Sequence, residues 1–107
     1  MQMVHTMEEL EHTIHHHTMA LVYISRPNCS VCHALLPQVE LLLESYPEVK
    51  AVHADADEIP EVAGAFSIFT VPVIMVFLEG KEMFREARFV PMESLERQLS
   101  KIYNAIL

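Results

Sequence analysis

The two cysteines of this chain, Cys29 and Cys32, stand three positions apart and follow an uninterrupted apolar run over residues 19–24. Such a run is typical of a strand that is buried on both faces of a sheet. Residues 26–28 interrupt it, and a helix that begins at Cys29 or Ser30 would place the first thiol at its N-terminus. Free N–H groups and the helix dipole favour the thiolate there. The pattern predicts a strand, a loop and a helix carrying two thiols that can form and reopen a disulfide.

A second informative pair, Val71-Pro72, introduces the apolar run over residues 73–78. Proline lacks an amide hydrogen, so within a sheet it is tolerated at the start or edge of a strand. Pro72 is therefore expected to mark the entrance of a strand.

Length and charge limit the kinds of protein this can be. A chain of 107 residues is expected to form one domain, residues 1–107, around a single core. Fifteen acidic residues against seven basic ones give a net charge of −8, which argues against nucleic acid and anionic membrane surfaces as partners. The longest apolar runs are far shorter than the roughly 20 residues of a membrane-spanning helix. We expect no membrane segment.

The first residues carry neither the basic nor the apolar part of a secretory signal, so a cytoplasmic location is expected. Thiols are kept reduced in that compartment. Two close cysteines then indicate redox or metal chemistry in preference to a structural disulfide.

Hydrophobic periodicity predicts nine elements in the order β-α-β-α-β-α-β-β-α. The expected strands cover residues 3–4, 19–25, 50–54, 73–78 and 81–89, and the two middle helices are expected over about residues 30–46 and 59–66. The first helix should begin after Thr6 and end near the histidines at residues 15–17, and the last should begin near Pro91 and carry an apolar stripe to Ile106. Thr6 and Glu9 have the spacing of a capping box at the start of the first helix. Glu79-Gly80 is expected to form a tight hairpin turn.

With this order, the chain resembles the thioredoxin family from about residue 3 to the C-terminus. The matching positions are Cys29 and Cys32 as the dithiol, Pro37 as the helix-kinking proline, Pro72 as the proline that the family holds in cis, and Gly80 in the hairpin. The resemblance implies an α/β thioredoxin fold, with a central mixed sheet of four to five strands flanked by helices. It also implies thiol–disulfide exchange through a redox-active disulfide without an organic cofactor.

The resemblance also implies residue roles. Cys29 would attack a disulfide and Cys32 would resolve the mixed disulfide. Val71 and Pro72 would receive an extended partner segment, with Asn28 and Val31 beside it. The partners would be protein or small-molecule disulfides and a reductase, and the protein would be a monomer.

Two alternative roles are open for several residues near this site. Arg26 would lower the pKa of a nearby thiol or be a solvated loop residue. Ile68 and Phe69 would line the groove for the partner together with Pro27, or pack in the core, and core packing is the expected reading for both.

Two departures from the family concern proton transfer. Tyr23 stands where thioredoxins carry a buried aspartate, and His53 stands where a lysine accompanies it. In the family, the carboxylate is thought to relay a proton from the second cysteine. His53 is the first candidate for a replacement proton acceptor. Tyr23 is expected to be a core residue and is the second candidate for that role.

Three alternatives use the same residues differently. A binding module would keep the fold with little turnover. A zinc protein would combine the two thiolates with His33 and with the histidines at residues 15–17. Cys29-x-x-Cys32-His33 also has the form of a haem attachment site, which requires export.

Overall fold

The computed structural model describes residues 1–106. The strands are β1 (Gln2–Val4), β2 (Met19–Ser25), β3 (Lys50–Asp55), β4 (Val73–Leu78) and β5 (Lys81–Ala87). The helices are α1 (Met7–His15), α2 (Ser30–Leu43), α3 (Glu61–Phe66) and α4 (Met92–Ile106). The predicted element order is confirmed.

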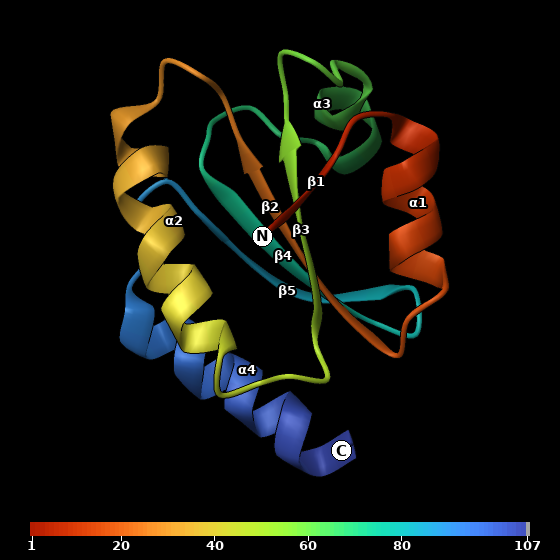
Figure 1. The fold of residues 1–107 in the computed structure, drawn as a ribbon, viewed down its shortest axis with the longest axis vertical. Helices are drawn as coiled ribbons and strands as arrows, with labels where there is room; N and C mark the ends of the chain where they lie inside the picture. The colour runs from red at the N-terminus through yellow and green to blue at the C-terminus, as the bar shows by residue number, and fades with distance from the viewer. Residues whose placement is uncertain (107) are drawn as a thin grey trace.

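The five strands form one mixed sheet in the order β1-β3-β2-β4-β5. β1 and β2 each pair with β3 in parallel, whereas β4 runs antiparallel to both β2 and β5. Helices α1 and α3 cover one face of the sheet, and α2 and α4 cover the other (Figure 1). The sheet thus forms the middle of three layers.

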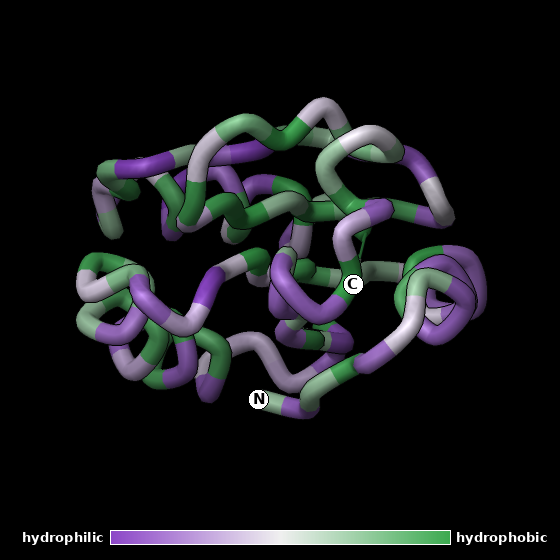
Figure 2. Tube along the Cα trace, turned by 90° about the horizontal axis from the view of Figure 1, so that it is seen from above, coloured by the Kyte–Doolittle hydropathy of each residue, from purple (hydrophilic) through white to green (hydrophobic). Residues whose placement is uncertain are grey.

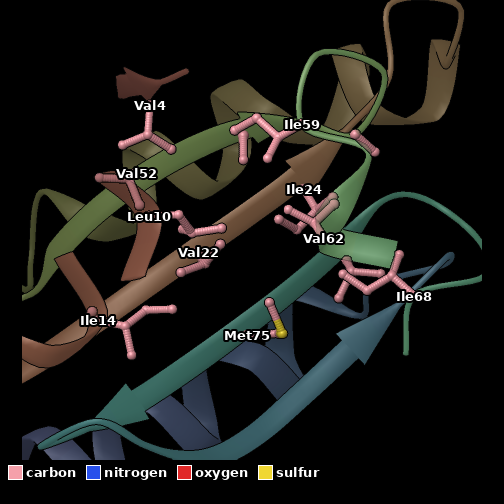
Figure 3. Close-up of a cluster of buried hydrophobic side chains, with 14 of the residues drawn as sticks. Val4, Leu10, Ile14, Val22, Ile24, Val52, Ile59, Val62, Ile68 and Met75 are labelled. Carbon is pink, nitrogen blue, oxygen red and sulfur yellow. The ribbon is translucent and has the colours of Figure 1, made fainter. Parts of the chain in front are cut away.

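All seven residues of β2 are buried, as expected of a central strand with helices on both sides. Alternate side chains enter two separate cores. Val22 and Ile24 join Leu10 of α1 and Val62 of α3 on one face (Figure 3). Met19, Leu21 and Tyr23 join the second core, with Leu35 and Val39 of α2 and Leu95 and Leu99 of α4. Hydrophobic stretches accordingly run through the middle of the chain trace, and the coils at its two sides carry both hydrophilic and hydrophobic residues (Figure 2).

Two local predictions are confirmed at the level of single residues. The hydroxyl of Thr6 caps α1 by accepting from the amide of Glu9 at 3.1 Å. Glu79 and Gly80 both have positive φ angles, 49° and 84°, which suits a two-residue hairpin between strands of right-handed twist.

Three elements are shorter than predicted. α2 ends at Leu43 because the amides of residues 44–46 each bond to a carbonyl three residues back and Pro47 follows. α3 begins at Glu61, after Pro60. β5 ends at Ala87 because Arg88 adopts a left-handed conformation, with φ at 66°.

None of the helices within residues 1–106 combines the length and the apolar character that crossing a bilayer requires.

Candidate active site

The junction between β2 and α2 positions the two cysteines. Cys29 is the N-cap residue of α2, with extended backbone angles, and its amide donates to the carbonyl of Arg26 at 3.3 Å. Cys32 lies in the first turn. The two are joined by a disulfide with a Cα–Cα distance of 5.2 Å, so the structure describes the oxidised form.

The sulfur of Cys29 takes the place of a capping oxygen. It accepts a hydrogen bond from the amide of Cys32 at 3.1 Å. No acidic side chain occupies the first turn of α2 to compete for the free N–H groups there. A thiolate on Cys29 would be stabilised by the same amide and by the positive end of the helix dipole.

The two cysteines differ in access to solvent. Cys29 is partly exposed, whereas Cys32 is only 1% exposed. An incoming molecule therefore meets the sulfur of Cys29, and the sulfur of Cys32 can be reached only from within the protein.

Val71 and Pro72 lie at the same end of the sheet as the cysteines. Val73, the next residue, pairs with Ile24 near the end of β2, just before the loop to Cys29. The Val71–Pro72 peptide bond is cis, as the family resemblance implies. Pro72 is buried and Val71 half-buried, and the carbonyl of Pro72 accepts from the amide of Arg88 at 2.8 Å.

Beneath the disulfide, Tyr23 is fully buried and reaches α2 with its hydroxyl. This group donates to the backbone carbonyl of Cys32 at 2.5 Å. Burial raises the pKa of Tyr23 to about 12, so the phenol stays protonated at neutral pH. Tyr23 is thus a hydrogen-bond donor to the first turn of α2, and a core residue as predicted.

His53 packs edge-on against Tyr23, with ring centroids 5.2 Å apart. Its Nε2 lies 2.5 Å from the hydroxyl of Ser25. Burial lowers the pKa of His53, and the nearby carboxylate of Asp55 partly opposes that effect. Sequence reasoning missed Ser25, although its place two residues after Tyr23 on β2 puts both side chains on the face that α2 covers.

The remaining predicted groove residues divide into two groups. Asn28 and Val31 are exposed, the latter by 43%. Ile68 is buried in the core as expected, but the expectation of core packing for Phe69 is wrong, because this side chain is 87% exposed. Arg26 forms an ion pair with Asp57 at 3.1 Å, as a loop residue would.

The zinc alternative is not favoured by the placement of its ligands. His33 donates from Nε2 to the carbonyl of Pro27 at 2.7 Å. The histidines at residues 15–17 precede β2, whereas the cysteines follow it, so strand β2 separates the two groups. Within residues 1–106, no three histidine, cysteine or acidic side chains gather where one ion would bind.

Comparisons with known proteins agree with this geometry. The Thioredoxin family model matches residues 1–101. The chain is 48% identical over 100 residues to thioredoxin-like protein YdfQ of Bacillus subtilis, covering 94% of this chain and 89% of that protein. It is 32% identical to thioredoxin 1 of Synechococcus elongatus, covering 76% of this chain and 77% of the relative.

Solved structures share the fold. Thioredoxin of Plasmodium falciparum superposes with a TM-score of 0.86 at 20% identity, over 94% of this chain and 98% of the other. Thioredoxin of Fasciola hepatica gives a TM-score of 0.85 at 25% identity, with the same coverage of 94% and 98%.

Proposed function

We propose that this chain, which belongs to the thioredoxin family and is a thiol–disulfide oxidoreductase, attacks the disulfides of protein partners through Cys29 and releases them through Cys32. The observation that carries these roles is the difference in access: Cys29 is partly exposed and Cys32 is 1% exposed. The amide of Cys32 beside the sulfur of Cys29 supports the same assignment, because it stabilises the attacking thiolate.

The exchange proceeds in two steps that start from the reduced protein. The thiolate of Cys29 attacks one sulfur of the partner, the partner's S–S bond breaks, and the second partner sulfur leaves and takes up a proton. The thiolate of Cys32 then attacks the sulfur of Cys29. The mixed disulfide breaks, and the first partner sulfur leaves and is protonated in turn. The partner gains two electrons and two protons, and the chain loses them as its own disulfide forms.

The second step requires that buried Cys32 lose its proton. His53 is the proposed acceptor, because burial lowers its pKa and keeps the imidazole unprotonated at neutral pH, and because it packs against Tyr23, whose hydroxyl contacts Cys32. Tyr23 is protonated already and is assigned a positioning role: its hydroxyl holds the carbonyl of Cys32. Ser25 orients the imidazole through Nε2.

The partner is proposed to bind as an extended segment beside Val71. In this mode, backbone groups of the residue before Pro72 pair with backbone groups of the partner. Exposed Asn28 and Val31 supply the flanking contacts. Half-buried Val71 is compatible with this role, since its main chain and not its side chain would make the contact.

The remaining parts of the cycle complete the proposal. A reductase that acts on disulfides returns two electrons to the Cys29–Cys32 pair. The chain itself uses no organic cofactor. The chain acts as a single-domain monomer in the cytoplasm, where a reducing thiol pool keeps the pair supplied with electrons.

Trapping experiments test the two roles. Replacing Cys32 by serine removes the resolving thiol, so Cys29 should accumulate as a mixed disulfide with a disulfide-bonded protein substrate. The adduct is measured by mass spectrometry under non-reducing conditions. The matched Cys29→Ser variant should form no adduct. An adduct on Cys32 in the Cys29→Ser variant that exceeds the one on Cys29 would reverse the assignment.

A further inference from the structure

A groove of about 330 Å³ lies between α2 and the segment that joins β5 to α4. Val31, Leu35 and Gln38 of α2 line one wall, and Arg88, Phe89 and Val90, between β5 and α4, line the other. Val31 stands between the two cysteines in the sequence, so one end of this groove is continuous with the site of disulfide exchange. None of Leu35, Gln38 or the residues of the second wall has a role in the reaction described above.

The groove exposes apolar side chains to water. Phe89 is 78% exposed and Val31 is 43% exposed, whereas Leu35, which lines the same wall as Val31, is buried. Apolar side chains left exposed on both walls of one groove can pack against an apolar side chain of a bound partner.

Arg88 lies at the end of this groove in an unusual backbone conformation. Its φ angle of 66° is left-handed, a region that disfavours side chains other than glycine, asparagine and aspartate. The amide of Arg88 donates to the carbonyl of Pro72 at 2.8 Å, which ties the groove to the cis-proline loop. Backbone strain of this kind concentrates at functional sites.

The guanidinium of Arg88 is available to a ligand. Arg26 and Arg85 each pair with a carboxylate of the chain, but no ion pair within residues 1–106 involves Arg88, which is exposed. In a chain with a net charge of −8, a cation that lines the same groove as Val31 is complementary to an acidic residue of the partner.

We propose that this groove binds the residues next to the cysteine of a protein substrate, with an apolar side chain packed between Phe89 and Val31 and an acidic neighbour paired with Arg88. The site selects among disulfides and is distinct from the backbone pairing at Val71. It deepens the proposed function and depends on it, since the occupant is a segment of the partner that Cys29 attacks.

Peptide disulfides test this selection. Each peptide carries one cysteine joined to a chromogenic aromatic thiol, with the same two residues placed on both sides of it: Leu-Asp, Leu-Lys or Ser-Asp. The reduced protein is mixed with each peptide, and the second-order rate of release of the coloured thiol is measured. Wild type should prefer Leu-Asp over Leu-Lys by at least about threefold, as an exposed ion pair provides. It should prefer Leu-Asp over Ser-Asp by about tenfold, as partial burial of a leucine provides.

Two variants and two matched controls are compared by the ratio of the rates that each shows on two peptides. A general loss of activity or of folded protein lowers both rates equally and leaves the ratio unchanged. Arg88→Glu should invert the Asp-to-Lys preference, whereas Arg97→Glu, the same charge change on the exposed part of α4, should keep it. Phe89→Ala should reduce the Leu-to-Ser preference to about twofold or less. Met83→Ala on β5, which is 43% exposed, should leave that preference in place.

The groove proposal is overturned if Arg88→Glu retains the wild-type order, if Arg97→Glu inverts it equally, or if Phe89→Ala keeps the full leucine preference. Failure of the proposed function has a different signature. Wild type would then fail to reduce hydroxyethyl disulfide, a neutral small molecule with no flanking residues, at a rate above that of the Cys29→Ser variant.

Discussion

Tyr23 links the sheet to the turn that carries the resolving cysteine through a single hydroxyl group. The ring packs in the core of the α2 face, and only the hydroxyl reaches the carbonyl of Cys32. A carboxylate at this position would be charged at neutral pH or, once buried, would bind a proton. The phenol instead provides a fixed donor, and the imidazole beside it is our proposed proton acceptor.

Replacing Tyr23 by phenylalanine keeps the ring and removes this donor. The free energy of unfolding should fall by about 1 kcal/mol, the net value of one hydrogen bond, measured by urea denaturation of the oxidised protein. Tyr103→Phe is the matched control, because the Tyr103 hydroxyl accepts only a long, exposed bond of 3.4 Å from the amide of Glu48. Equal losses of unfolding free energy in both variants would show that the buried hydrogen bond of Tyr23 stabilises the protein no more than the exposed bond of Tyr103.

His53 should control the pH dependence of partner release. Because its pKa is lowered, the imidazole is neutral at pH 7 and can accept the proton of Cys32. In His53→Gln, resolution of a mixed disulfide should slow by about tenfold or more at pH 7 and recover as the pH rises and hydroxide removes the proton. Stopped-flow measurement of the second step at several pH values tests this. Identical pH profiles in variant and wild type would exclude His53 as the acceptor.

Among the elements, the hairpin between β4 and β5 depends on two left-handed residues. Gly80 has a φ angle of 84°, and a Cβ atom built on it would lie 2.8 Å from Nδ1 of His15 at the end of α1. The turn thus brings the sheet close to α1 at the end opposite the cysteines. Glycine is required here both by the backbone angle and by the close approach.

Gly80→Ala should therefore lower the free energy of unfolding by about 1–2 kcal/mol, the cost of the left-handed conformation for a residue with a Cβ. Gly64→Ala provides the internal control. Gly64 lies within α3 with open space around it, so alanine there should stabilise the helix by up to about 1 kcal/mol. Both values come from thermal or urea unfolding, and two changes of the same sign would contradict this account of the turn.

At the scale of the whole molecule, His53 also ties stability to pH. The folded protein lowers the pKa of this imidazole, so between the unfolded value of about 6.5 and the lower folded value the unfolded chain binds more protons. The stability that comes from holding His53 neutral is present above pH 6.5 and is lost as the pH falls through this window.

The free energy of unfolding of wild type should accordingly decrease between pH 7.5 and 5.5, and that of His53→Gln should decrease less. His12→Gln, which removes an exposed histidine from α1, serves as the control for the loss of one titrating group. A His53→Gln variant whose stability falls as steeply as that of wild type would refute the linkage.

Much of the architecture could be predicted from local patterns. The limits of β2 and β4, the capping threonine and the hairpin turn follow from runs of apolar residues and from residues with special backbone preferences. The predicted ends of α2 and β5 were wrong because a short-range turn and the left-handed Arg88 end these elements. Neither feature leaves a periodic signal in the sequence.

The candidate site also combines features that local sequence predicts with features that depend on the tertiary structure. The spacing of Cys29 and Cys32 is local and was visible in the sequence. The contacts of Tyr23 with Cys32 and of Ser25 with His53 depend on which side chains the sheet and α2 bring together, with 28 positions separating the latter pair. The exposure of Phe69 could not be foreseen, because a hydrophobic residue in a loop is ordinarily expected inside.

The hydrogen bond between the amide of Arg88 and the carbonyl of Pro72 joins the cis-proline loop to the segment that follows β5. Phe89 follows Arg88 directly, so we expect a displacement of the cis-proline loop to shift Phe89, and the proposed backbone pairing at Val71 to be coupled to the proposed side-chain selection at Phe89. Substitutions at these two positions should then show a coupling energy in a double-mutant cycle instead of adding. An attempt to engineer a new partner preference should therefore vary both segments together, because a substitution in one is expected to change the effect of a substitution in the other.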